Sequence, residues 1–201
     1  QLSEATLIEM IIEEIIELLE QEYGPREWQP GKEPIDVLVG TILSQNTSDV
    51  NSGRAFNSLL STFGNWEAVV AAPAEHIAQA IKFGGLSRIK AVRIKQILAK
   101  IEREQGCIRL DFLNSMNIFE AKDYLMRLPG VGQKTAYCVL LFSLGKPCFP
   151  VDTHVFRVAK RLGLIDSRVS IEEAHGLLQE QIPPSKVYQF HLHMIEHGRQ
   201  V

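Results

Sequence analysis

Residues 128–136 read Leu-Pro-Gly-Val-Gly-Gln-Lys-Thr-Ala and place two glycines, Gly130 and Gly132, between two helical segments. Two glycines separated by a single residue permit a tight hairpin and the close approach of another backbone. They also leave the first amides of the following helix free to bind an anion, with support from the helix dipole. A DNA phosphate is a suitable anion, so Gly130, Val131, Gly132 and Thr135 are candidate DNA-binding residues. A plain corner between two helices explains the glycine spacing equally well.

Lys134 lies in the first turn of the helix that follows the glycines. The helix dipole disfavours a cation at this end of a helix, and the same field favours the neutral amine over the ammonium. A neutral amine is a nucleophile. Lys134 is therefore a candidate nucleophile, and the alternative is a solvated lysine that contacts a phosphate.

Asp152 lies eighteen residues after Lys134, within Pro150-Val151-Asp152-Thr153-His154, and precedes another helical segment. Aspartate is a preferred N-cap, so capping is the simplest role for this carboxylate. A capping carboxylate that faces a sugar carbon can also stabilise positive charge while a glycosidic bond breaks. The two roles are compatible.

Apolar side chains recur at three- and four-residue steps along most of the chain, whereas the alternation typical of strands persists nowhere. The first helix is acidic and amphipathic; Ser3 can start it, and Tyr23-Gly24-Pro25 ends it. Further helices are predicted over residues 34–44, 49–63, 65–71, 73–81, 87–105, 119–127, 133–144, 153–162, 170–181 and 187–197. The predicted fold class is therefore all-α.

The composition is that of a soluble globular protein, with 45% apolar and 22% charged residues. No apolar stretch reaches the ~18 residues of a membrane span, and the acidic N-terminal segment does not resemble a signal or transit peptide. The three cysteines, Cys107, Cys138 and Cys148, have no metal-ligand spacing. We therefore expect no membrane partner, no bound metal and reduced thiols.

Charge is distributed unevenly along the chain, although the net charge is only −3. Residues 1–36 hold ten acidic and two basic side chains, whereas residues 82–104 hold seven basic and two acidic ones. A local basic segment of this kind is typical of a nucleic-acid contact. A solvated helix face is the alternative interpretation.

Three further segments join the hairpin and Val-Asp-Thr-His in a resemblance to the helix-hairpin-helix DNA glycosylases of the endonuclease III type. Leu-Ser-Gln-Asn-Thr-Ser-Asp at residues 43–49 resembles the loop of this family that enters DNA near the extruded base. Gly-Leu-Ser-Arg-Ile-Lys-Ala at residues 85–91 resembles its second loop, in which the leucine is a wedge. Residues 190–199 resemble the last helix before an iron–sulfur cluster. The resemblance extends from about residue 34 to the end of the sequence.

The resemblance implies two helical lobes that flank a DNA-binding cleft. One lobe is a six-helix barrel over residues 36–146 that contains the helix-hairpin-helix, and the other combines residues 1–35 and 147–201. Lys134 and Asp152 then belong to different lobes, and we expect both at the cleft.

The resemblance also implies a bifunctional DNA glycosylase and AP lyase that acts on duplex DNA with a damaged base or an abasic site. In the family, the counterpart of Lys134 attacks the sugar C1′, expels the base and forms a Schiff base, after which β-elimination cuts the strand. The counterpart of Asp152 assists the displacement. Because a base inside a duplex is unreachable, the enzyme extrudes it and fills the gap with side chains. Asn46 and Leu86 match these wedge positions; the other implied DNA contacts are Gln45, Thr47, Asp49, Arg88, Lys90 and His154.

The identity of the base stays open, because the chain departs from the family pattern in the wedge loop. The first expectation is that the excised bases are damaged pyrimidines, in particular oxidised ones. However, the family usually has glutamine where this chain has Asn46, and Gln45-Asn46 resembles the Gln-Gln-Thr of the adenine branch, which usually lacks the lysine. Residues 91–95 and 121–125 resemble the plant 5-methylcytosine glycosylases. The alternatives are a glycosylase for mismatched thymine or uracil or for modified cytosine, a non-catalytic helix-hairpin-helix module, and a structural all-α protein.

The four-cysteine cluster of the family begins at the position after Val201, where the given sequence ends, and none of the three cysteines matches a ligand. We therefore expect no cofactor in these residues and a [4Fe–4S] cluster in a longer, intact protein. The alternatives are a shortened form of the protein or a branch that has lost the cluster. A monomer is expected, in the cytoplasm of a bacterium or archaeon, or in the nucleus or an organelle of a eukaryote.

Overall fold

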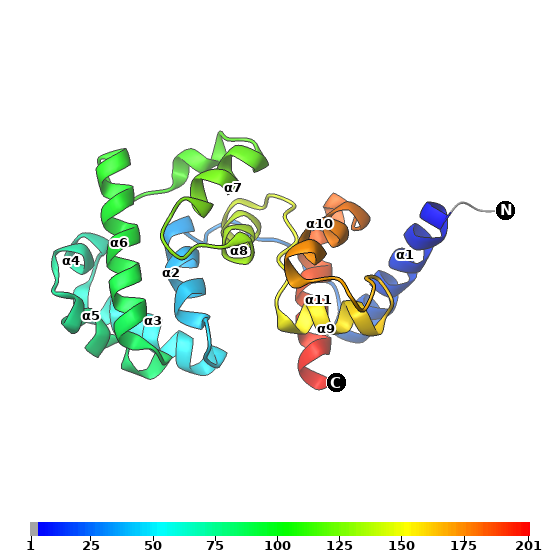
Figure 1. Ribbon diagram of the computed structural model, residues 1–201, viewed down its shortest axis with the longest axis horizontal. Helices are drawn as coiled ribbons and strands as arrows, with labels where there is room; N and C mark the ends of the chain where they lie inside the picture. The colour runs from blue at the N-terminus through cyan, green and yellow to red at the C-terminus, as the bar shows by residue number, and fades with distance from the viewer. Residues whose placement is uncertain (1–3) are drawn as a thin grey trace. The chain divides into compact units, whose positions relative to one another are not determined.

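The computed structural model describes residues 4–201, and it describes side chains from Ile8 onward. Every regular element in this part of the chain is a helix (Figure 1), which confirms the predicted all-α class. The predicted start at Ser3 lies outside the described residues. The α-helices are α1 Glu4–Tyr23, α2 Pro34–Ser44, α3 Asp49–Phe63, α4 Trp66–Ala71, α5 Ala74–Ala80, α6 Ser87–Gln105, α7 Ile118–Met126, α8 Gln133–Leu144, α9 Thr153–Arg161, α10 Ile171–Gln181 and α11 Val187–Gln200. Short 3-10 helices are η1 Lys82–Gly84, η2 Asp111–Asn114 and η3 Pro184–Lys186.

The chain divides into two compact units. The hairpin unit is Lys32–Val139, and the terminal unit combines Gln1–Gly31 with Leu140–Val201. Residues 32–35 thus belong to the hairpin unit and residues 140–146 to the terminal unit, whereas the sequence analysis had placed them the other way round. The helix α8 begins in one unit and ends in the other.

The hairpin unit is built around α6, which packs on α2, α4 and α5. The apolar side chains that α6 contributes to the core are completely buried, and so are those that α2 places opposite them. These side chains are Leu38, Val39, Ile42, Leu43, Ile94, Ile97, Leu98 and Ile101. The elements begin where the sequence supplies caps: Pro34 stands at the first turn of α2, the Ser48 hydroxyl accepts from Asn51 N at the start of α3, and Asn117 and Glu120 form a capping box on α7.

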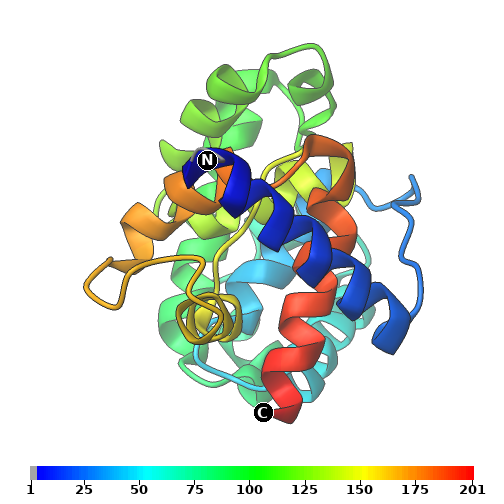
Figure 2. The same ribbon diagram turned by 90° about the vertical axis from the view of Figure 1, so that its right-hand side faces the viewer.

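The terminal unit has its own core, to which α1, α9, α10 and α11 contribute. Figure 2 shows α1 in blue beside α11 in red, and α11 also packs on α9. The largest buried side chains of this core are Phe149 and Phe190, whose rings stack with centroids 5.8 Å apart. Trp28 lies against Gly145 and donates from Nε1 to the Phe142 carbonyl at 3.1 Å, which fastens the segment after α1 to the end of α8. Among residues 4–201, none of the helices combines the length and apolar character that a membrane crossing needs.

Candidate functional site

The turn between α7 and α8 depends on one of its two glycines. Gly130 has a φ of +73°, in the left-handed region, and a Cβ at this position would collide with the side chain of Arg93. Gly132 is exposed, lies outside the left-handed region, and has no atom within 4 Å of an added Cβ. The hairpin expected at these residues is present, but the fold requires glycine only at Gly130.

The start of α8 offers backbone amides to an anion. The first helical hydrogen bond in this region runs from Ala136 N to Gly132 O at 3.0 Å, so the amides of residues 133–135 precede the hydrogen-bonded part of the helix. Val131 and Thr135 are only 6% and 4% exposed, and their predicted role in DNA binding stays a prediction. Any contact of these two residues with DNA would use their backbone.

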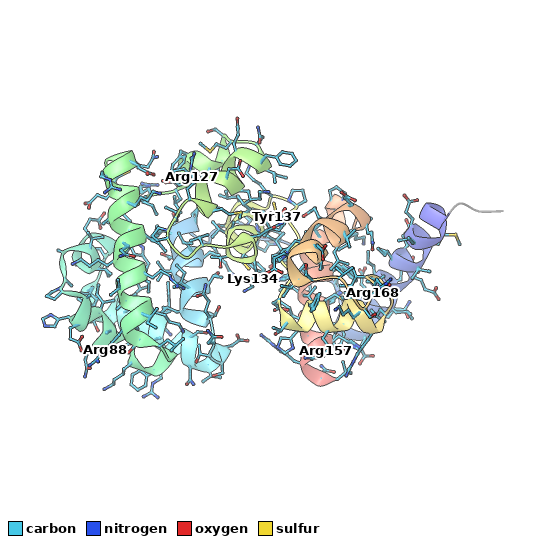
Figure 3. The ribbon with its side chains drawn as sticks, in the orientation of Figure 1. Arg88, Arg127, Lys134, Tyr137, Arg157 and Arg168 are labelled. Atoms are coloured by element: carbon cyan, nitrogen blue, oxygen red, sulfur yellow. The ribbon has the colours of Figure 1, made fainter. Side chains whose placement is uncertain are left out.

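Lys134 stands in the first turn of α8, half-buried (Figure 3). Among the side chains that the structure describes, none forms a hydrogen bond or ion pair with its ammonium group. The nitrogen is thus uncommitted within the part of the chain that the structure describes, as is expected of a nucleophile. Position and exposure are compatible with the predicted catalytic role of Lys134, which stays a prediction.

Asp152 is the N-cap of α9, and its Oδ1 accepts from Val155 N at 2.8 Å. The predicted capping role is therefore confirmed. The second oxygen, Oδ2, has no partner in the described part of the chain, and the residue is half-buried. Capping fixes the orientation of the carboxylate and leaves one oxygen available for chemistry.

Asn46 and Leu86, the two predicted wedge residues, share an unusual backbone conformation. Their φ angles are +53° and +49°, and they are the only non-glycine residues with positive φ within residues 4–201. Both side chains are exposed, Leu86 by 52%. A left-handed conformation costs a leucine about 1–2 kcal/mol, and strained backbone of this kind is concentrated at functional sites. The strain is independent support for the two positions that the resemblance singled out.

Lys90 does not contact DNA, and the prediction that it would is wrong. Its side chain is only 2% exposed, and its Nζ donates to the Leu43 carbonyl at 2.7 Å and to the Gly84 carbonyl at 2.6 Å. Burial lowers the pKa of Lys90 below its ordinary value. Arg88, by contrast, is exposed and forms only a surface ion pair with Glu75 at 3.7 Å, so it is accessible to a phosphate.

Arg93 is a residue that sequence reasoning missed. Its Nη1 donates to Gln45 Oε1 at 3.0 Å, and its side chain covers Gly130. Since arginine has no acceptor, the atom of Gln45 that faces it must be the amide oxygen, and the amide nitrogen keeps its two donors for another partner. Helical spacing could have indicated that both side chains point inward, because Lys90 lies four residues before the buried Ile94 and Arg93 lies four residues before the buried Ile97.

Three comparisons with known proteins agree on one family. Residues 39–184 match the family described as HhH-GPD superfamily base excision DNA repair protein. The chain belongs to this family. The Arabidopsis thaliana protein At3g47830 is 41% identical over 165 residues, which are 82% of this chain and 56% of that protein. Endonuclease III of Thermotoga maritima is 32% identical over 169 residues, which are 84% of this chain and 75% of that enzyme.

A solved structure described as a non-covalent endonuclease III–DNA complex resembles this HhH-GPD protein with a TM-score of 0.82 and 28% identity. The match covers 99% of this chain and 87% of the solved one. The predicted resemblance to endonuclease III is thereby confirmed. The chain spans 56% of the length of the plant relative.

The remaining predicted contacts of this HhH-GPD protein differ in their accessibility. Thr47 is half-buried and Asp49 is exposed in the first turn of α3. His154 is half-buried, and its Nδ1 lies 3.1 Å from the Gly198 carbonyl. A Cβ at Gly198 would lie 2.9 Å from His154 Cβ, so His154 takes part in the packing of α9 against α11. Its contact with DNA stays a prediction.

The residues present do not fit the iron–sulfur cluster of the family. Within the described residues, no group of three or more His, Cys, Asp or Glu side chains is arranged to hold a metal ion. Cys107 is exposed, whereas Cys138 and Cys148 are buried. No step of the reaction proposed for this chain therefore uses a cluster, and a cluster in a longer protein stays a prediction.

Proposed function

We propose that the chain is a base-excision DNA glycosylase with AP lyase activity, which removes damaged pyrimidines from duplex DNA. The observation that carries the proposal is the state of two side chains. Among the described residues, no side chain binds the Lys134 nitrogen after the Gly130 turn, and Asp152 caps α9 with one carboxylate oxygen that has no partner. Membership of the HhH-GPD superfamily and the likeness to an endonuclease III–DNA complex support the proposal.

DNA binding is assigned to the start of α8 and to the exposed basic side chains of α6. The amides of residues 133–135 and the dipole of α8 attract a phosphate, and the exposed Gly132 lets the phosphate approach the backbone closely. Arg88 adds positive charge at the start of α6. Each phosphate neutralised releases counterions, so the affinity for DNA should fall with added salt.

In the proposed reaction, the neutral amine of Lys134 bonds to C1′ of the extruded nucleotide while the C1′–N bond breaks. The base leaves with the bonding electron pair and takes up a proton. Asp152 stabilises the positive charge that develops on the sugar. Opening of the sugar ring gives a Schiff base; loss of a C2′ proton then breaks the C3′–O bond and cuts the strand, and water finally releases the lysine. The proposal requires both side chains to act on one deoxyribose.

Borohydride trapping on a duplex with an abasic site tests the assignment of the nucleophile. Wild type should form a covalent adduct, and Lys134→Ala should form none. Lys122→Ala is the matched control, because Lys122 is a half-buried lysine on the neighbouring helix α7 and should leave trapping unchanged. Equal trapping by wild type and Lys134→Ala would show that another residue is the nucleophile.

A panel of lesion duplexes under single-turnover conditions tests the substrate class. Release of an oxidised pyrimidine with strand cutting supports the proposal. Release of thymine or uracil opposite guanine without a trapped adduct would instead identify a monofunctional mismatch glycosylase, and release of 5-methylcytosine would identify a glycosylase for modified cytosine. Salt-dependent binding without any base release or strand cutting would identify a non-catalytic DNA-binding module.

A further inference from the structure

A single buried lysine joins the two loops that carry the strained residues. Lys90 reaches from α6 to the Leu43 carbonyl in the last turn of α2 and to the Gly84 carbonyl at the end of η1. Asn46 follows the first of these carbonyls by three residues, and Leu86 follows the second by two. The two hydrogen bonds therefore act on the backbone immediately before each exposed wedge position.

The carbonyls that Lys90 binds belong to helix ends. The last carbonyls of a helix have no partner within the helix, and they form the negative end of its dipole. An ammonium group can satisfy two such carbonyls at once, whereas an apolar side chain of the same length would leave both unsatisfied in the core. This requirement explains why a lysine occupies a position on the apolar face of α6, four residues before Ile94.

The Leu86 loop also lies close to the Asn46 loop and to α3. A Cβ on Gly85 would lie 3.7 Å from the Asn46 carbonyl, and a Cβ on Gly84 would lie 3.2 Å from Ala55 on α3. Close packing and the shared ammonium thus hold Asn46 and Leu86 at neighbouring places on the hairpin unit. Arg93 adds a restraint of another kind, because it holds the side chain of Gln45 and not its backbone.

We propose that Lys90 is a positioning residue for base extrusion, which holds the loops of Asn46 and Leu86 together so that both side chains enter the duplex as one wedge. The inference rests on the proposed function, since it assumes that the chain extrudes a nucleotide. Lys90 itself touches neither DNA nor the reacting atoms. Its effect is therefore specific to the step that opens the duplex.

Lys90→Met tests this role, because methionine keeps the length and the apolar stem of lysine and removes the donors. Ile101→Ala is the matched control: Ile101 is buried on the same helix, eleven residues and about 16 Å further along, and its loss should lower stability without altering the loops. Chemical unfolding of both variants measures how much of each loss is due to stability alone.

Three signals are compared for wild type and both variants. The first is the fluorescence of 2-aminopurine placed next to a non-cleavable analogue of the target nucleotide, which reports extrusion without chemistry. The second is the single-turnover rate of base release, and the third is borohydride trapping at an abasic site, where no base has to leave the stack. For Lys90→Met we expect extrusion and base release to fall about tenfold more than trapping, which corresponds to about 1.4 kcal/mol in activation free energy. Placing the target base opposite an abasic site should restore most of the loss, since such a base is already unpaired.

The outcomes separate the inference from the proposed function. Extrusion by Lys90→Met at the wild-type rate would overturn the inference, and so would an equal reduction of all three signals, as expected for Ile101→Ala. Wild type that extrudes the target but neither releases a base nor forms an adduct would overturn the proposed function alone, because the extrusion signal would still measure the effect of Lys90.

Discussion

The two glycines of the hairpin are expected to respond to alanine in different ways. Gly130 has a left-handed backbone and lies under the side chain of Arg93, whereas Gly132 has neither constraint. The fold therefore requires the first glycine. The second has free space around it, so a requirement for glycine there would come from a ligand that approaches the backbone.

The magnitudes follow from these contacts. In Gly130→Ala, a left-handed alanine costs about 1–2 kcal/mol. The displaced Arg93 also gives up its 3.0 Å hydrogen bond to Gln45, which is worth about 1 kcal/mol at a half-buried site. The total is about 2–3 kcal/mol, and for a chain of this size it lowers Tm by about 4–12 °C. In Gly132→Ala, the weaker capping by alanine and the reduced freedom of the unfolded chain nearly cancel, so stability should change by no more than about 0.5 kcal/mol.

The affinity for DNA should respond in the opposite order: among correctly folded proteins, Gly132→Ala should lose more affinity than Gly130→Ala. A methyl group at Gly132 occupies the space in front of the amides of residues 133–135, where the phosphate is proposed to bind. We expect Kd for a duplex with an abasic-site analogue to rise about tenfold, or about 1.4 kcal/mol. Urea unfolding followed by circular dichroism measures the stability of each variant, and fluorescence anisotropy measures the affinity. Equal stability losses in the two variants would refute the conformational argument, and wild-type affinity of Gly132→Ala would refute the phosphate site.

Three further predictions concern single side chains. Asp152→Asn should keep the cap of α9, since asparagine caps as well as aspartate, and should slow base release by about a hundredfold or more, whereas Asp152→Ala should also lose about 1 kcal/mol of stability. Single-turnover rates measure base release, and chemical unfolding measures stability. Unchanged base release by Asp152→Asn would remove the catalytic role of Asp152. Burial raises the pKa of Tyr124 from 10.0 to about 12, so the phenol stays protonated in the folded state at pH values where it ionises in the unfolded state. The stability that this difference contributes is lost as pH rises from 10 towards 12. Unfolding of Tyr124→Phe should lack this loss, and an identical pH profile would contradict the assignment. Arg93→Met frees Gln45 Oε1 and lets the amide turn. Because Gln45 is a predicted DNA contact beside the wedge position Asn46, the preference for a lesion duplex over an undamaged one should weaken, while trapping at an abasic site stays within about threefold. An unchanged preference would show that the orientation of Gln45 is irrelevant.

The limits of the helices followed from local chemistry, which the sequence displays. Pro34 opens α2, Ser48 caps α3, Gly106 ends α6 with a left-handed backbone, and Asp152 caps α9. Each of these effects acts within a few residues of its cause. The same holds for the turn at Gly130, although the sequence alone did not reveal that Gly132 differs from it.

The roles of the basic side chains on α6 were predicted less well, because the prediction used their charge and not the face of the helix on which each side chain lies. Lys90 and Arg88 belong to one basic segment, yet Lys90 is buried and Arg88 is exposed. The helical period places Lys90 with Ile94 and Ile101, so its burial was predictable in principle. The left-handed backbone of Leu86 was not predictable, because it depends on contacts between segments far apart in the sequence.

Bond breaking and base selection are thus assigned to different parts of the chain. The candidate nucleophile and carboxylate stand at the starts of α8 and α9, where capping orients the carboxylate. The wedge candidates stand on loops whose backbone is held by Lys90. Substitution of Lys90 should therefore alter which base is extruded and how fast, and it should leave the reaction at an abasic site largely unchanged. In the proposed mechanism, the residues that start α8 and α9 act on the sugar and phosphate, which every nucleotide shares, so base identity is expected to depend on those loops.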